Sequence, residues 1–594
     1  MDFPYLKPSS VYEETQDAFL GYNHNLRIGG NEWYDMSNVS PRCFPMFTPR
    51  EPRGMVRQLT SPQGLIARDA LVYVDGATLY INHIAVTGLV LSTASAYVPK
   101  QLISMGAYII IMPDKKYVNT ADLTDYGSIE SSFSFTGDVV YTPARVDGTE
   151  LPMNDIPVAS TPPTDPVNAS YWIDTSDILG DVLRQYSAMS DTWTEIPSTY
   201  TKIALTGIGS YFEIYDGVEI AGCAYTGADV SLTAQIPLLN GSHVLYAVSA
   251  NYIIVTGLLT KVHTQTGATV TVKRLMPAMD FITESENRLW GCKYGFVNNE
   301  TVNEIYACAQ GDFKNWNKFL GISTDSYAAS VGTDGKFTGA ITYLGYPLFF
   351  KENCLHKIFG SMPSNYRIDT VVCRGVQEGS AKSLAIVNEL LFYKGRTEVL
   401  VYDGSLPVGV SEALGTATYR AAVGGAYKDR YYVSMTDGTA YSLFFFDTTN
   451  KLWYREDAMK VSAFAQLDDD LYFIDDTTKK LMAEFGKTGT LEAAVTFSAT
   501  SGIIGYLYKD RKYVSRINVR AKLASAATLT VSFRYDSTGS WISAGTVTAT
   551  GLTRTVMLPL KPRRCDHFEM KLEGTGDVRI FSISRILQLG ADAR

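Results

Sequence analysis

Side chains suited to acid–base or metal chemistry are scattered through this sequence. The six histidines stand singly, without the spacing of a metal site. Two of them, His83 and His356, fall on expected strands, where a hydrogen-bonded or rim histidine is a more ordinary interpretation than a catalytic one. Phosphate-loop, zinc-protease and nucleophile-elbow motifs are missing from the sequence. We therefore predict no catalytic, cofactor-binding or metal-binding residues, no cofactor and no enzymatic activity. The histidines are His24, His83, His243, His263, His356 and His567.

Two acidic segments could carry chemistry. Asp468, Asp469 and Asp470, with Asp475 and Asp476, could hold Ca²⁺, but they lack the alternating spacing and glycine of a calcium loop. We expect two solvated hairpin turns there. The segment DSTGSW at residues 536–541 is similar to the Asp-box turn of sialidases, but it occurs once, and a β-turn explains it. Cleavage of glycans by paired carboxylates stays open as an alternative.

Charge and cysteine content restrict the partners and the compartment. A net charge of −9 and a pI near 5.4 argue against a protein that binds nucleic acid tightly by its phosphates. They do not exclude a channel through which DNA slides, and an ordinary acidic surface is the more usual explanation of this charge. The group Lys561, Arg563 and Arg564 around Pro562 could touch phosphate, and an exposed turn explains it equally well. Seven cysteines without a C-x-x-C pair indicate free thiols in a reducing cytoplasm. We see no secretion signal and no apolar stretch of membrane-spanning length.

A repeat organises the chain. Short strands rich in Leu, Tyr and Phe are joined by polar turns, and the last four repeats begin about 40 residues apart, the length of a four-stranded propeller blade. A β-solenoid, the competing architecture, has shorter repeats. We predict an all-β chain built on a six- or seven-bladed β-propeller. The repeats lie at residues 71–81, 108–118, 288–309, 346–360, 389–404, 430–454 and 470–485.

The period breaks twice, which predicts further domains. We expect an N-terminal arm and propeller closure at 1–60, propeller at 61–126, an inserted β domain at 127–277, propeller again at 278–488, and a jelly-roll-like antiparallel β-sandwich at 489–594. Residues 44–58 should pair with the last blade near 461–485, because an unpaired terminal strand would leave an open edge. Weak helical periodicity occurs at 12–21 and 99–106.

Several stretches resemble phage proteins identified as packaged-DNA stabilisation or tail nozzle proteins. The opening segment at 31–54, NEWYDMSNVSPRCFPMFTPREPRG, resembles theirs, and the block at 285–360 is the most specific. Residues 374–393 and the closing strands at 558–585 are also similar. The motif at 171–196 recurs in phage structural proteins. The likeness covers most of the chain, is weakest at about 130–270, and offers no catalytic residues to carry over.

The resemblance implies a virion protein of a tailed phage, made in the host cytoplasm and placed in the nozzle ring at the distal end of a short tail. Its partners would be itself, in a homohexamer, tail adaptor or portal-proximal proteins, fibre or needle proteins, and genomic DNA in passing, without stable membrane association. Such a ring forms and closes the DNA ejection channel and gives fibres a docking surface. The alternative is a receptor-binding or glycan-cleaving propeller tail protein.

Overall fold

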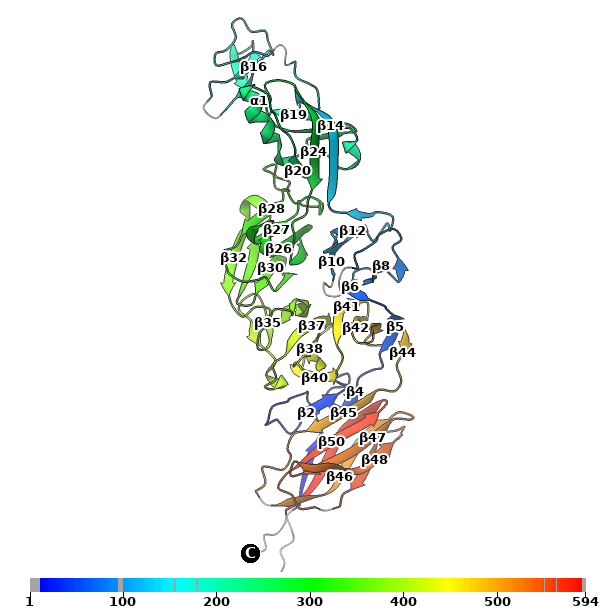
Figure 1. The fold of residues 1–594 in the computed structure, drawn as a ribbon. Coiled ribbons are helices and arrows are strands. Elements are labelled where there is room, and N and C mark those ends of the chain that lie inside the picture. Colours follow the sequence, from blue (N-terminus) through cyan, green and yellow to red (C-terminus); the bar gives the residue numbers. More distant parts are fainter. Residues whose placement is uncertain are drawn as a thin grey trace, which may run out of the picture.

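The structure is a computed structural model that describes residues 11–93, 100–152, 156–177, 180–509, 511–549, 551–561 and 563–589. Strands make up 53% and helices 4%, which confirms the predicted all-β fold. Figure 1 shows an elongated molecule with three parts end to end: the inserted domain, a propeller, and a sandwich from which the C-terminus leaves. Within the described residues, no helix is long and apolar enough to cross a membrane.

Seven sheets form the propeller. Six have four strands, and the seventh carries a fifth strand. The innermost strands contact one another in the order β6, β10, β25 and β29, then through a short 3₁₀ turn (η5, Ala381–Ser383) to β33, β37, β41 and back to β6. The ring therefore closes with seven blades, the larger of the two predicted numbers.

The blade strands follow the predicted repeats. Their second strands are buried on both faces, because each blade packs between two neighbours, which explains the continuous apolar runs in the sequence. Residues 101–105, where helical periodicity was expected, form a blade strand. The first three blades are β6 (Pro62–Ala67), β7 (Leu71–Asp75), β8 (Thr78–Ile81) and β9 (Ile84–Ala85); β10 (Gln101–Met105), β11 (Tyr108–Met112), β12 (Lys116–Asn119) and β13 (Tyr126–Ser128); and β25 (Phe281–Ser285), β26 (Arg288–Val297), β27 (Glu300–Ala307) and β28 (Tyr327–Ser330).

The next four blades run on without a break. They are β29 (Gly339–Tyr343), β30 (Tyr346–Lys351), β31 (Cys354–Phe359) and β32 (Arg367–Val372); β33 (Ala385–Val387), β34 (Leu390–Lys394), β35 (Val399–Tyr402) and β36 (Val408–Gly409); β37 (Arg420–Tyr427), β38 (Arg430–Thr436), β39 (Tyr441–Asp447) and β40 (Leu452–Asp457); and β41 (Val461–Leu467), β42 (Asp470–Asp475) and β43 (Lys480–Ala483) with β5 (Gly54–Gln58) and β44 (Thr490–Leu491).

The N-terminal strand β5 closes the ring. It pairs antiparallel with β43, so that Gln58 faces Lys480 and Gly54 faces Ala483. The predicted pairing of residues 44–58 with the last blade is therefore confirmed for 54–58, whereas Phe47 bridges to Ile580 of the sandwich. β44 pairs with the other edge of β5. A Cβ atom at Gly54 would lie 1.9 Å from the backbone oxygen of Thr488, so the position requires glycine.

The inserted domain leaves the propeller after β13 and returns to it before β25. Its main sheet has the order β21-β20-β24-β14-β19-β23-β22, and its long strands β14 and β24 are paired. A short helix, α1 (Val230–Gln235), is capped by Asp229. The strands are β14 (Ser131–Ala144), β19 (Tyr200–Ala204), β20 (Gly217–Ala221), β21 (Gly241–Val244), β22 (Ala247–Ser249), β23 (Tyr252–Thr256) and β24 (His263–Arg274).

A smaller sheet, the tip sheet, belongs to the same insertion. It contains β15 (Val158–Ala159), β16 (Tyr171–Asp174), β17 (Val182–Ser187) and β18 (Thr192–Glu195). Its core is small: Ile156, Ile173 and Leu183 are buried there, apart from the main core of the domain. Figure 1 places β16 at the far end of the molecule.

The sandwich consists of sheets with the orders β1-β51-β46-β49 and β2-β45-β50-β47-β48. β1 pairs along β51 and β2 along β45, so the segment 1–60 is not only an arm and a propeller closure, as expected, but also supplies sandwich strands. Each covers a sheet edge that the C-terminal strands leave open. The first half of the weakly helical stretch at 12–21 is therefore strand. The strands are β1 (Val11–Gln16), β2 (Trp33–Ser37), β45 (Thr496–Ser501), β46 (Lys512–Leu523), β47 (Thr528–Tyr535), β48 (Thr538–Thr548), β49 (Arg554–Pro559), β50 (Phe568–Thr575) and β51 (Val578–Leu589).

Candidate functional sites

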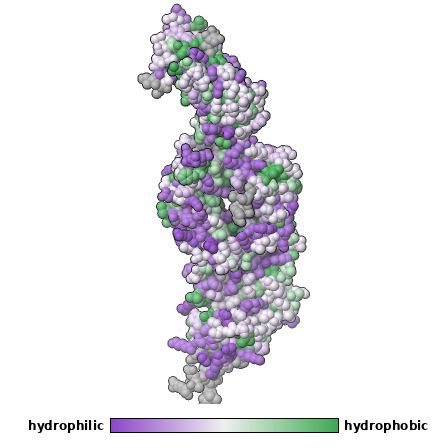
Figure 2. Space-filling view, in the orientation of Figure 1, coloured by the Kyte–Doolittle hydropathy of each residue, from purple (hydrophilic) through white to green (hydrophobic). Residues whose placement is uncertain are grey.

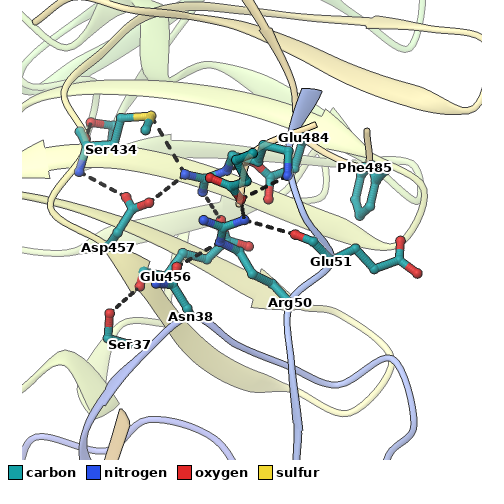
Figure 3. A network of polar contacts seen from close by, with 12 residues as sticks. Ser37, Asn38, Arg50, Glu51, Ser434, Glu456, Asp457, Glu484 and Phe485 are labelled. Carbon is teal, nitrogen blue, oxygen red and sulfur yellow. Dashed lines mark hydrogen bonds and ion pairs between the residues drawn. The ribbon is translucent and has the colours of Figure 1, made fainter. Parts of the chain in front are cut away.

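A buried arginine joins the propeller closure to its neighbours. The guanidinium of Arg53, 1% exposed, donates from Nη2 to Glu456 at 2.5 Å, from Nη1 to Asp457 at 2.5 Å and from Nε to Glu484 at 2.6 Å (Figure 3). Glu456 and Asp457 end strand β40, Glu484 follows β43, and Arg53 precedes β5. One cation therefore ties together the last two blades and the closing strand.

A second arginine extends this junction toward the sandwich. Arg50 Nη1 pairs with Glu492, and its Nε donates to Asn38 Oδ1 at 2.7 Å. Asn38 follows β2 of the sandwich, and its backbone N–H donates to the carbonyl of Glu456 at 2.6 Å. The network thus links the propeller to the sandwich through charge-assisted hydrogen bonds.

The carboxyls around Arg53 respond differently to burial. For Glu484, desolvation raises the pKa well above its ordinary value, and neighbouring Glu456 adds to that rise against the opposing charge of Arg53. For Asp457, desolvation also acts upward, but the charge and hydrogen bond of Arg53 outweigh it and hold the pKa below its ordinary value. Because the cation is fully occupied by three carboxylates, this cluster stabilises the fold and offers no free acid to a ligand.

A hollow of about 540 Å³ opens near the starts of inner strands β10, β25, β29 and β33. Its charged side chains are Asp280, Lys336 and Glu378. Asp280 Oδ1 accepts from Lys293 Nζ at 2.6 Å, and Glu378 Oε1 accepts from Lys336 Nζ at 3.1 Å. The latter pair is exposed, so its carboxylate is accessible to a ligand. Two carboxylates and a cation on different blades can bind sugar hydroxyls or serve as an acid and a base.

A buried polar group lies between the third and fourth blades. His356, 0% exposed, hydrogen-bonds through Nε2 to Thr333 Oγ1 and through Nδ1 to Thr370 Oγ1, both at 2.9 Å. Lys351 Nζ donates to the carbonyl of Thr333 at 2.7 Å and to Asn303 Oδ1 at 2.9 Å. Burial, helped by the charge of Lys351, lowers the pKa of His356 to about 4. A neutral, doubly hydrogen-bonded imidazole fills this interface.

The aspartates of the last blade match the predicted solvated turns only in part: Asp468 and Asp469 are exposed in the turn between β41 and β42, but Asp470 and Asp475 are buried. Asp470 is 2% exposed, and its carboxylate accepts the backbone N–H groups of Leu471 and Phe485, both at 2.8 Å. Asp475, 7% exposed, binds the backbone of the next turn. These carboxylates hold the hairpins of the blade in place. In the described part of the chain, no group of three or more His, Cys, Asp and Glu could hold a metal ion.

The remaining motifs lie in the sandwich or in the core. Asp536 has φ 53° in the turn between β47 and β48, and its carboxylate accepts the N–H of Asp566 at 2.8 Å. Lys561, Arg563 and Arg564 are exposed, and Pro562 lies outside the described residues. All seven cysteines are free thiols. His24 bonds the carbonyl of Tyr34 at 2.8 Å.

Sequence reasoning missed Arg53, Asp280 and Glu378. The carboxylate partners of the Arg53 side chain lie 403 to 431 residues away along the chain, so no local sequence motif predicts these contacts. Asp280 and Glu378 each precede an inner strand, which was recognisable once the blades were aligned. Their convergence depends on the closure of the ring.

Solved structures match this chain at low sequence identity and low TM-score. An exo-β-1,3-galactanase from Phanerochaete chrysosporium matches with 8% identity and a TM-score of 0.21, over 51% of this chain and 94% of the other. A family 43 arabinoxylan arabinofuranohydrolase from Bacillus subtilis matches with 10% identity and a TM-score of 0.19, over 52% and 94%. PorZ, a surface component of the type IX secretion system of Porphyromonas gingivalis, matches with 11% identity and a TM-score of 0.25, over 84% and 70%.

No protein-family model and no curated protein matches the sequence. Glycoside hydrolases stand among the matching structures, so the prediction that nothing in the chain is enzyme-like is wrong, and it is withdrawn. All of these TM-scores lie below 0.5, so the matches assign neither a fold nor an activity to this chain.

Proposed function

We propose that this chain is a structural protein of a tailed-phage virion, a protomer of the nozzle ring at the distal end of a short tail. One observation carries the proposal. The chain forms an elongated stack of three β modules (Figure 1). Its propeller is closed by its own N-terminal strand and is joined to the sandwich through Arg50 and Asn38. Several rigid rods of this kind, placed side by side, would form the wall of a tube.

The ring would consist of six copies around a DNA channel, with tail adaptor proteins on one side and fibres or a needle on the other. The protomer carries a net charge of −9, so a lumen lined largely by acidic surface would repel phosphate and let DNA pass. The ring would retain the genome by closing the channel sterically.

Disrupting the gene in the phage that carries it tests the proposal. Particles lacking the protein should assemble heads but lose their packaged DNA, and supplying the full chain should restore retention. Particles that keep their genome and fail only at host attachment would contradict it.

A second candidate, glycan binding or cleavage, is favoured by the hollow around Asp280 and Glu378. A propeller can bring carboxylates from separate blades together at one end of its axis, as these two residues illustrate. Arabinoxylan, β-1,3-galactan and bacterial surface glycans are the substrates to try. Release of sugar that Glu378→Gln abolishes, and that the exposed control Asp69→Asn on the first blade retains, would support this function. Absence of both binding and release would oppose it.

A further inference from the structure

The charge of the chain is unevenly distributed. Residues 489–594 contain 15 Lys and Arg against 8 Asp and Glu, while the rest of the chain contains 37 against 53. An acidic protein therefore carries a basic C-terminal region, and Figure 2 shows hydrophilic residues over the sandwich end of the molecule. Charge segregated in this way marks a surface for an anionic partner.

Four of these cations form a basic face, defined as Arg516, Arg520 and Lys522 on β46 and Arg579 on β51. Positions on β46 alternate: Ile517, Val519 and Ala521 are at most 1% exposed and fill the sandwich core, while the three cations are exposed on the outer side. Lys522 lies directly opposite Arg579 across the strand pair. The basic face therefore belongs to the outer surface of a single sheet.

The cations of the basic face have no carboxylate partners. None of the four forms an ion pair with a described residue, whereas the other sheet of the same sandwich pairs Arg534 with Glu569 at 2.5 Å and Lys571 with Glu573 at 2.6 Å. Like charges directly opposite each other on a sheet are destabilising, as Lys522 and Arg579 are. An anion lying over the sheet would relieve that repulsion.

We propose that the basic face binds the phosphate backbone of duplex DNA. This deepens the proposed function, on which it rests, by naming where the protomer touches the genome. Neighbouring outward positions are Asn518, Thr555 and Ser582, whose small polar side chains suit phosphate and sugar. These residues offer no ring on which a single-stranded base could stack, so the face suits a duplex.

The magnitude of this contact fits a channel that must release DNA. Four phosphate contacts give a slope of about −3.6 for log K against log salt, so affinity falls by about 100-fold between 50 and 200 mM salt. Contact is therefore measurable in dilute salt and weak at physiological ionic strength.

Fluorescence anisotropy of a labelled 30-base-pair duplex with the full chain tests the proposal. The variant R516Q/R520Q/K522Q/R579Q should bind at least tenfold more weakly at 50 mM salt and lose about 3 to 4 units of salt slope for each bound face. The control K261Q/R367Q/K428Q/K487Q removes the same charge from exposed sites elsewhere and should keep most of the binding.

Three results would overturn the proposal: equal losses in both variants, unchanged binding in the first, or poly-glutamate binding as tight as that of the duplex, which would assign the face to an acidic protein. Thermal melting checks that each variant is folded. If the fourfold variant melts at a lower temperature than the wild type, the four single substitutions replace it, and each should lower the slope of log K against log salt by about one unit. Imaging of the oligomer distinguishes the nozzle proposal from the DNA-binding proposal. A ring that forms but does not bind DNA would contradict DNA binding by the basic face and would leave the nozzle proposal intact.

Discussion

At the scale of single residues, Arg53 forms three ion pairs, more than any other residue that the structure describes. Replacing it with Met would leave Glu456 and Glu484 buried without their cation, and removing one partner of a buried ion pair costs about 3–5 kcal/mol. Urea unfolding of Arg53→Met should therefore show a loss of this size. Arg68→Gln, which removes an exposed pair with Asp69, is the control and should change stability by less than about 1 kcal/mol. Equal losses in the two variants would refute the assigned role.

His356 makes stability depend on pH. Its pKa falls from 6.5 to about 4 on folding, because burial penalises the imidazolium, so the unfolded chain binds the extra proton more readily. The stabilisation is complete above pH 6.5 and is lost as pH falls from 6.5 toward 4, by about 3 kcal/mol in total. Urea unfolding at pH 7 and pH 5 should show about 2 kcal/mol of this decrease, and His356→Gln should flatten it. An unchanged pH slope in that variant would count against the assignment.

The sequence could not reveal these residue roles. His356 stands alone in the chain, and its hydrogen-bonding to Thr333 and Thr370 arises only when strands of one blade and a loop before it meet. Asp470 lies within a run of aspartates that resembles a solvated turn, yet its carboxylate is buried and accepts hydrogen bonds from three backbone N–H groups. These contacts could not be predicted because the residues lie far apart along the chain, not because of their residue types.

At the scale of elements, closure of the propeller depends on β5 lying tightly between β43 and β44. Gly54→Ala would force a Cβ against the backbone oxygen of Thr488, and overpacking of this kind costs about 1–3 kcal/mol. We expect a lower melting temperature and faster proteolysis near residues 486–491. Gly30→Ala, where nothing lies within 4 Å, is the matched control and should behave like the wild type. If Gly54→Ala resisted proteolysis and heat as well as the wild type does, closure of the propeller by β5 would be contradicted.

The tip sheet should be dispensable for the rest of the fold. Its core of Ile156, Ile173 and Leu183 is separate from that of the main insertion sheet. Replacing residues 153–198 with a short Gly-Ser linker should leave propeller and sandwich folded, with a cooperative melt close to that of the full chain. The hydrogen bond from Gln235 to Asp181 at 3.0 Å would be lost. Aggregation or a non-cooperative melt would show that the tip sheet supports the whole lobe.

The positions of the strands were easier to predict from the sequence than the contacts of single residues. The repeats located the blades because strands buried on both faces read as apolar runs, as in residues 108–112. The blade number stayed open, since the insertion interrupts the period and outer strands such as β9 contain two residues. β1 was missed because its sequence, VYEETQ, is largely exposed and lacks the apolar alternation of a core strand.

At the scale of the whole molecule, the three modules lie end to end and the joints between them are polar. At the joint between insertion and propeller, the Asp216 carboxylate accepts from Arg274 Nη1 at 2.5 Å and from Asn315 Nδ2 at 3.0 Å. At the joint with the sandwich, Arg50 pairs with Glu492. Buried, charge-assisted contacts at both joints favour a stiff rod over a flexible chain of domains. Stiffness of this kind is what a wall of parallel protomers requires.

The most direct test of the nozzle proposal is electron microscopy of the purified full-length protein, imaged by negative stain at micromolar concentration. The account predicts rings with an axial opening, built from six elongated protomers. Isolated rods at every concentration, together with glycan turnover that depends on Asp280 and Glu378, would contradict it and favour the second candidate.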